Sequence, residues 1–203
     1  MYSALGETVG SGSRIGALPY LATRPVTLSG FDGAPDTLRA MIEAVQGPRG
    51  EQSMFVRAFL DEIIAGVQPK DYAGEIVAVR NWVAENVRYT NDPIHVELVK
   101  SPQTLIEEWQ ERGIAIGDCD DIATLIGCFH CLLGREAQLM PVGFGPPGHF
   151  SHVFERCKEP RTGAWIICDP VAGTREREMA SRITTYEIWS LDEPPKHGPV
   201  AEG

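Results

Sequence analysis

One run of residues in the middle of the chain, from Gly117 to Gly134, most restricts the fold. Large apolar side chains recur there three and four positions apart, at 122, 125, 126, 129, 132 and 133, which is the period of a helix with one apolar face. Gly117 permits a tight turn before this helix, and Gly134 is a typical residue to end it. Cys119 then lies at the helix N-terminus, on the edge of the apolar face.

A cysteine in this position suits nucleophilic chemistry. The N-terminus of a helix carries about half a positive charge, which favours a thiolate, and its backbone N–H groups offer a site for an oxyanion. Acidic residues at 118, 120 and 121 oppose a second negative charge, so activation of Cys119 requires a histidine partner. The alternative is that Cys119 is a small core residue of an apolar helix.

Two strands are expected after this helix, at 150–157 and 163–169, with turn-forming residues between them. If Lys158 faces Gly163, the antiparallel register places His152 opposite Asp169, and the β-carbons of such a pair lie about 5 Å apart. An aspartate in that position holds an imidazole in the tautomer that accepts a thiol proton.

Two nearby residues are weighed against this assignment. His149 follows the turn-rich stretch 145–148 and competes with His152 as the base, although we expect it in a loop at the rim of the site. Glu155 is predicted to lie on the opposite strand face from His152, as a solvated charge.

The order and spacing of these residues resemble the transglutaminase-like superfamily, a papain-related cysteine fold, in its small bacterial or bacteriophage type. The similarity includes Cys119 at a helix start, His152 with the aromatic Phe154 two residues later, and Trp165 four residues before Asp169. The family usually has tryptophan at the position of Phe154.

Upstream segments agree with this resemblance, which spans about residues 70–172. Residues 81–89 are similar to the family helix that ends in an aromatic, and 101–105 to the loop and short helix that lead to the cysteine.

The resemblance implies that Cys119 is the nucleophile, His152 the base and acid, and Asp169 the residue that orients the base. A side-chain donor for the oxyanion is not evident from the sequence. Trp109 and Gln103 are candidates because they are close in sequence.

The other cysteines allow a metal interpretation. Cys128 and Cys131 have the spacing of a zinc pair, and Cys157 and Cys168 would add two ligands. The first pair lies within a helix rich in small residues, where a thiol commonly fills space, and the second pair lacks that spacing. We therefore expect no metal and no cofactor, and reduced thiols of the kind found in cytoplasmic proteins.

Composition sets further bounds. The chain has 203 residues, 43% of them apolar, which suits one catalytic domain with appendages. Its net charge of −10 argues against nucleic-acid binding and against an anionic lipid surface. The sequence lacks a secretory signal and a run of 18 apolar residues, so no membrane partner is expected.

The chain divides into an extended N-terminal arm (1–35), a transglutaminase-like domain (36–191) and a flexible tail (192–203). Periodicity predicts helices at 37–46, 52–67 and 72–88, and strands at 137–144, 152–157, 165–169 and 184–189. Helices followed by strands indicate an α+β fold with an antiparallel sheet.

The function expected from these features is thiol-dependent acyl transfer on an amide of a protein or peptide. Hydrolysis by a cysteine peptidase or amidase is preferred over transfer to an amine, which crosslinks proteins. The alternative is a structural or assembly protein, for example a bacteriophage virion component, that binds a protein partner through residues 1–35. The expected location is the cytoplasm, or the virion if the gene belongs to a phage.

Overall fold

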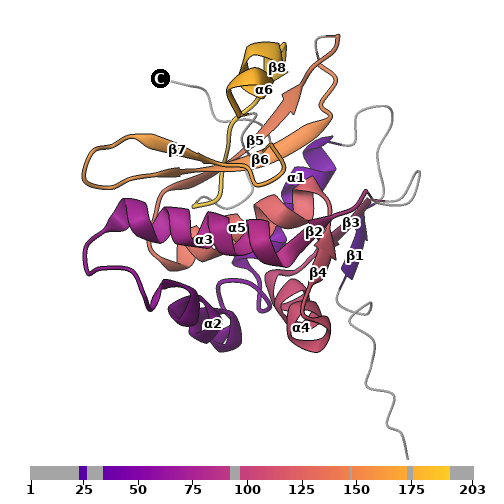
Figure 1. The fold of residues 1–203 in the computed structure, drawn as a ribbon. Helices are drawn as coiled ribbons and strands as arrows, with labels where there is room; N and C mark the ends of the chain where they lie inside the picture. Colours follow the sequence, from indigo (N-terminus) through magenta and orange to yellow (C-terminus); the bar gives the residue numbers. More distant parts are fainter. Residues whose placement is uncertain (1–22, 27–33, 92–96, 147, 173–175, 193–203) are drawn as a thin grey trace, which may run out of the picture.

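The computed structural model describes residues 23–26, 34–91, 97–146, 148–172 and 176–192 (Figure 1). The helices are α1 (Ala34–Gln46), α2 (Met54–Ile64), α3 (Tyr72–Asn86), α4 (Pro102–Arg112), α5 (Cys119–Leu132) and α6 (Glu176–Arg182). The strands are β1 (Thr23–Val26), β2 (Val87–Tyr89), β3 (Glu97–Lys100), β4 (Ala115–Gly117), β5 (Ala137–Gly143), β6 (His152–Lys158), β7 (Trp165–Cys168), β8 (Thr185–Tyr186) and β9 (Trp189–Ser190). The predicted α+β class, with an antiparallel sheet after the helices, is confirmed. Among the described helices, none has the length and apolar character needed to span a bilayer.

Helix α5 occupies the centre of the molecule. It packs against β5 and β6 on one side and against α1, α3 and α4 on others (Figure 1). Nearly all its side chains are therefore buried, including those outside the predicted apolar face. A β-carbon at Gly127 would lie 2.4 Å from Leu191 Cδ1, so glycine lets the Leu191 side chain pack directly on the helix, and a larger residue would displace it. Gly134 follows α5 with φ = 68°, in the left-handed region expected at a helix end.

The main sheet has the order β7-β6-β5-β8, with β9 also paired to β5, and its pairs are antiparallel. Lys158 pairs with Trp165, so the predicted pairing with Gly163 is wrong by two residues. The carboxylate of Glu159 accepts the N–H groups of Arg161 and Thr162. These bonds make the turn wider than the sequence suggested.

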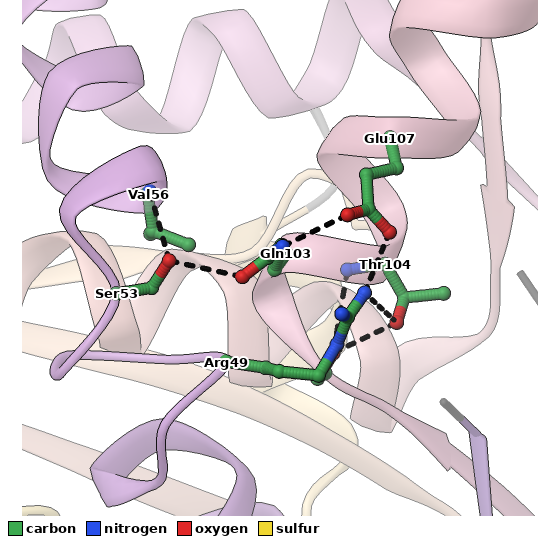
Figure 2. A network of polar contacts seen from close by, with 7 residues as sticks. Arg49, Ser53, Val56, Gln103, Thr104 and Glu107 are labelled. Atoms are coloured by element: carbon green, nitrogen blue, oxygen red, sulfur yellow. Dashed lines mark hydrogen bonds and ion pairs between the residues drawn. The ribbon is translucent and has the colours of Figure 1, made fainter. Parts of the chain in front are cut away.

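Polar contacts fix α4 against the chain before α2 (Figure 2). Ser53 caps α2 by accepting the N–H of Val56, and its hydroxyl lies 2.9 Å from Gln103 Oε1. Arg49 donates to Glu107 Oε2 at 2.5 Å and to Ser101. This network positions the helix that leads into β4 and then into α5.

Some predicted boundaries differ from the observed ones. The helix predicted at 72–88 ends at Asn86, because residues 87–89 form β2 and pair in parallel with β4. The strand predicted at 184–189 is two short strands, β8 and β9. Helix α6 was not predicted.

Part of the predicted N-terminal arm belongs to the fold. Residues 23–26 form β1, which pairs antiparallel with β3, and helix α1 already begins at Ala34. The rest of the arm, at 1–22 and 27–33, and residues 193–203 of the predicted tail lie outside the described residues.

Candidate active site

Cys119 is the first residue of α5, at the helix N-terminus predicted from the sequence. Asp118 caps the helix, and its carboxylate accepts the N–H of Asp121 at 3.4 Å. The carboxylate of Asp121 in turn accepts the N–H of Lys100 at 2.7 Å. A β-carbon at Gly117 would lie 2.7 Å from the Asp121 β-carbon, so glycine allows β4 to run directly into the first turn. The first turn of α5, which carries the half-buried Cys119, is therefore fixed by the cap and by β3 and β4.

His152 and Asp169 meet although their predicted register is wrong. Nε2 of His152 lies 2.7 Å from Oδ2 of Asp169, and the side chains are 10% and 2% exposed. Oδ1 of Asp169 accepts the N–H groups of Val171 and Ala172 at 3.0 and 3.2 Å. These two bonds fix the carboxylate and leave Oδ2 directed at the imidazole.

The side chain of Cys119 lies close enough to the same imidazole to raise its pKa. Because Asp169 occupies Nε2, the ring nitrogen available to the thiol is Nδ1. Burial disfavours a charged imidazole, but the hydrogen bonds to Asp169 and Cys119 and their negative charges outweigh it and raise the pKa of His152 to about 9. The structure thus brings together the three residues that the sequence predicted, with His152 as an imidazolium at neutral pH.

The remaining thiols have a different environment. Burial, reinforced by nearby carboxylates, raises the pKa of Cys128, Cys131, Cys157 and Cys168 far above the usual range of a thiol. All five cysteines are free of disulfides. Among the described residues, Cys119 is the cysteine whose side chain contributes to the raised pKa of an imidazole, that of His152.

The two residues weighed against this assignment have different outcomes. His149 is exposed in the loop before β6, as predicted. Glu155 is fully buried, with Oε1 3.0 Å from Nδ1 of His130, so its prediction as a solvated charge is wrong. The face of β6 that carries Glu155 is covered by α5 rather than by water.

Neither predicted oxyanion donor is available to the site. Trp109 Nε1 donates to Asn86 Oδ1 at 2.7 Å, and its ring packs against those of Phe59 and Trp82. Gln103 Nε2 donates to Glu107 (Figure 2). Sequence proximity to Cys119 was a poor guide because both side chains belong to the packing of α4.

Tyr89 is a site residue that the sequence did not identify. It ends β2 and pairs with Gly117 on β4, two residues before Cys119. Burial, followed by the negative charges of Cys119, Asp118 and Asp169, raises the pKa of Tyr89 to about 12. Its hydroxyl is therefore a neutral donor at physiological pH, and it donates to Asn91 Oδ1 at 2.8 Å.

A cavity of about 320 Å³ opens beside His152. Its lining consists of Phe144, Ser151, His152, Val171, Ala172, Glu178, Met179 and Arg182. Its walls are largely apolar, while Glu178 and Arg182 place charges of opposite sign at an exposed rim. A substrate segment can lie here in contact with the imidazole.

Comparisons with known proteins add little to this geometry. No family model and no curated protein matches the chain. Among solved structures, the chain is similar to a protein from Parabacteroides distasonis whose assignment as a protease is itself provisional, with a TM-score of 0.49 and 12% identity. The alignment covers 77% of this chain and 29% of the other, so this chain spans less than a third of that protein's length. A likeness this distant carries no argument about function, which is argued from the site.

Proposed function

We propose that this chain is a cysteine hydrolase of the transglutaminase-like superfamily that cleaves an amide bond in a peptide or protein. The observation that carries the proposal is the imidazole of His152, which Asp169 binds at 2.7 Å on Nε2 and whose pKa is raised both by Asp169 and by the side chain of Cys119. A structural histidine needs neither a thiol at a helix N-terminus nor a cavity beside it.

The proposed reaction has two halves. The Cys119 thiolate attacks the amide carbonyl, the C–N bond breaks, and the His152 imidazolium gives its proton to the leaving amine. The neutral imidazole then takes a proton from water, which attacks the thioester and releases the acid and the thiolate. Asp169 holds the Nε2–H throughout, so Nδ1 carries the proton that is transferred.

The proposal is tested with a library of peptides from a digested proteome, analysed by mass spectrometry for new termini. We expect cleavage by the native chain and none by Cys119→Ala, while Cys128→Ala, which changes a buried thiol outside the site, keeps the activity. Adding a primary amine reveals transfer instead of hydrolysis, because the products then carry the amine. Identical products from the native chain and Cys119→Ala would refute the proposal.

The first prediction concerns selectivity among the thiols. Iodoacetamide at pH 6 should alkylate Cys119 at least about 10-fold faster than the other four, since an ordinary thiol with a pKa of about 8.5 is less than about 1% thiolate at that pH. His152, with its pKa of about 9, keeps its positive charge there and stabilises the Cys119 thiolate. Peptide mapping identifies the labelled residue, and faster labelling of Cys128 or Cys157 would contradict the assignment.

The second prediction concerns Tyr89 as a donor to the oxyanion. Tyr89→Phe should slow acylation of Cys119 by p-nitrophenyl acetate by about 10-fold or more, because the hydroxyl, which can rotate away from Asn91 Oδ1, is then lost as a donor to the developing oxyanion. Alkylation by iodoacetamide creates no oxyanion, so its rate should change less than about 2-fold. An equal loss in both reactions would instead mean that Tyr89 positions the thiol.

A further inference from the structure

A second cluster of chemically active side chains lies in the core, where α5 packs on β6. His130 comes from α5, and Glu155 and Cys157 come from β6; all three are fully buried. One nitrogen of His130, one carboxylate oxygen of Glu155 and the sulfur of Cys157 all lie within 4.8 Å of one another. None of the three takes part in the proposed reaction.

The backbone adds a fourth side chain to this cluster. Cys168 on β7 is the direct cross-strand partner of Glu155, and such partners have β-carbons about 5 Å apart on the same face of a sheet. Cys157, two residues after Glu155, projects from that face as well. Its cross-strand partner is Ile166, so Cys157 and Cys168 are diagonal neighbours facing α5.

The cluster lacks the hydrogen bonds that a buried carboxylate requires. Glu155 Oε1 lies 3.0 Å from His130 Nδ1, whereas Glu155 Oε2 has no partner with hydrogen-bond geometry among the described residues. The thiol of Cys168 is close enough to this carboxylate for Glu155 to raise its pKa. A buried carboxylate oxygen without a partner is costly, and proteins satisfy such groups with a cation, a proton or an enclosed water. The surrounding thiols and imidazole identify which cation would suit.

We propose that His130, Glu155 and Cys157, with Cys168 in the fourth position, form a structural Zn²⁺ site. Imidazole, thiolate and carboxylate are the ligands that zinc takes in closed tetrahedral sites. Ligand atoms about 2.0–2.3 Å from a tetrahedral ion lie about 3.3–3.8 Å apart. The ligand atoms of His130, Glu155 and Cys157, which lie within 4.8 Å of one another, therefore need to move by only about 1 Å, whereas Cys168 is not within that distance of all three and has to move further. Binding would release the protons of both thiols.

This site keeps Cys157 and Cys168 from the zinc set considered from the sequence, but has His130 and Glu155 in place of Cys128 and Cys131. In the part of the chain that the structure describes, those two thiols do not join a group of ligands. The ion would instead link α5, which begins at Cys119, to β6, which begins at His152. A zinc ion here would hold the two elements of the candidate active site together.

The test uses the full chain carrying Cys119→Ala, so that the reactive thiol cannot bind metal. The protein is unfolded in denaturant in the presence of a chelator, and the chelator is then removed. It is refolded with Zn²⁺ or Co²⁺ and passed through gel filtration, and the metal bound per chain is measured. We expect about one equivalent, a thiolate-to-cobalt charge-transfer band, and a higher melting temperature with zinc than without. Less than about 0.1 equivalent in the folded protein would overturn the proposal.

Variants identify the ligands. Glu155→Gln and Cys157→Ser should each lower the bound metal at least about 10-fold, as the loss of one ligand predicts. Cys128→Ala is the matched control, because Cys128 is equally buried on α5 but outside the cluster, and it should keep one equivalent. Circular dichroism restricts the comparison to folded variants. Full binding by folded Glu155→Gln and Cys157→Ser, or its loss in Cys128→Ala, would show that the ion binds elsewhere.

Discussion

Replacing His152 with alanine should slow the alkylation of Cys119 at pH 7 by about 100-fold or more, because the thiolate loses its imidazolium partner. The matched control is His149→Ala, three residues away in an exposed loop, which should change the rate by less than about 2-fold. The measurement is the second-order rate with iodoacetamide, followed by peptide mapping of Cys119. A large effect of His149→Ala and a small one of His152→Ala would move the base into the loop.

The raised pKa of His152 can also be tested by the pH dependence of the unfolding free energy. Its pKa rises from 6.5 in the unfolded chain to about 9 in the folded one, so the folded state binds the proton more tightly. The resulting stabilisation is fully present below pH 6.5 and is lost as the pH rises through 9; a shift of this size corresponds to at most about 3 kcal/mol. The difference in unfolding free energy between the native chain and His152→Ala should therefore shrink from pH 6 to pH 10. A difference that does not vary with pH would contradict a raised pKa.

The sequence predicted which three side chains meet, but not the strand register that brings them together. The predicted register failed because Glu159 organises a wider turn, and a two-residue shift of the pairing was not evident from turn composition. Asp169 still reaches His152 because it lies just after β7, where its side chain is fixed by two backbone N–H groups of the following turn. Spacing within a hairpin therefore indicated proximity more reliably than the exact register.

The helix around Cys119 was predicted well because its apolar repeat is long. The burial of its other sides was not predicted. A helix at the centre of a fold is buried on all sides, whereas periodicity reveals only its most apolar face. The same limitation explains why Glu155 was wrongly predicted to be a solvated charge. Alternation along β6 correctly placed it on the face opposite His152, but both faces of this strand are covered: one by α5, and the other by a cluster that includes Met140 and Phe154.

Tyr89 was missed for a different reason. It reaches the site through the parallel pairing of β2 with β4, two strands of three residues each. Strands this short carry no readable alternation, and Tyr89 lies 30 positions before Cys119 in the sequence. Only the folded backbone brings the two together.

Asp169→Asn should slow alkylation of Cys119 at pH 7 by about 10-fold or more while leaving the fold intact. The asparagine oxygen can still accept the N–H groups of Val171 and Ala172, which now bind Oδ1 of Asp169. Its NH₂ group then points at Nε2 of His152 and donates to it. This bond forces the imidazole proton onto Nδ1, so the neutral ring presents a donor to the thiol where it should present an acceptor.

Thermal unfolding and thiol reactivity of Asp169→Asn are measured on the same preparation. If Asp169 orients the base, the rate should fall, and the unfolding free energy measured at pH 10, where the raised pKa of His152 no longer stabilises the fold, should change by less than about 1 kcal/mol because the amide preserves size and hydrogen bonding. If Asp169 only closes the turn before Pro170, stability should fall by about 1 kcal/mol or more and the folded fraction should react normally. Asp169→Ala, which removes both functions, should lower the rate and the stability together. Native reactivity in folded Asp169→Asn would refute the triad and, with it, the hydrolase proposed here.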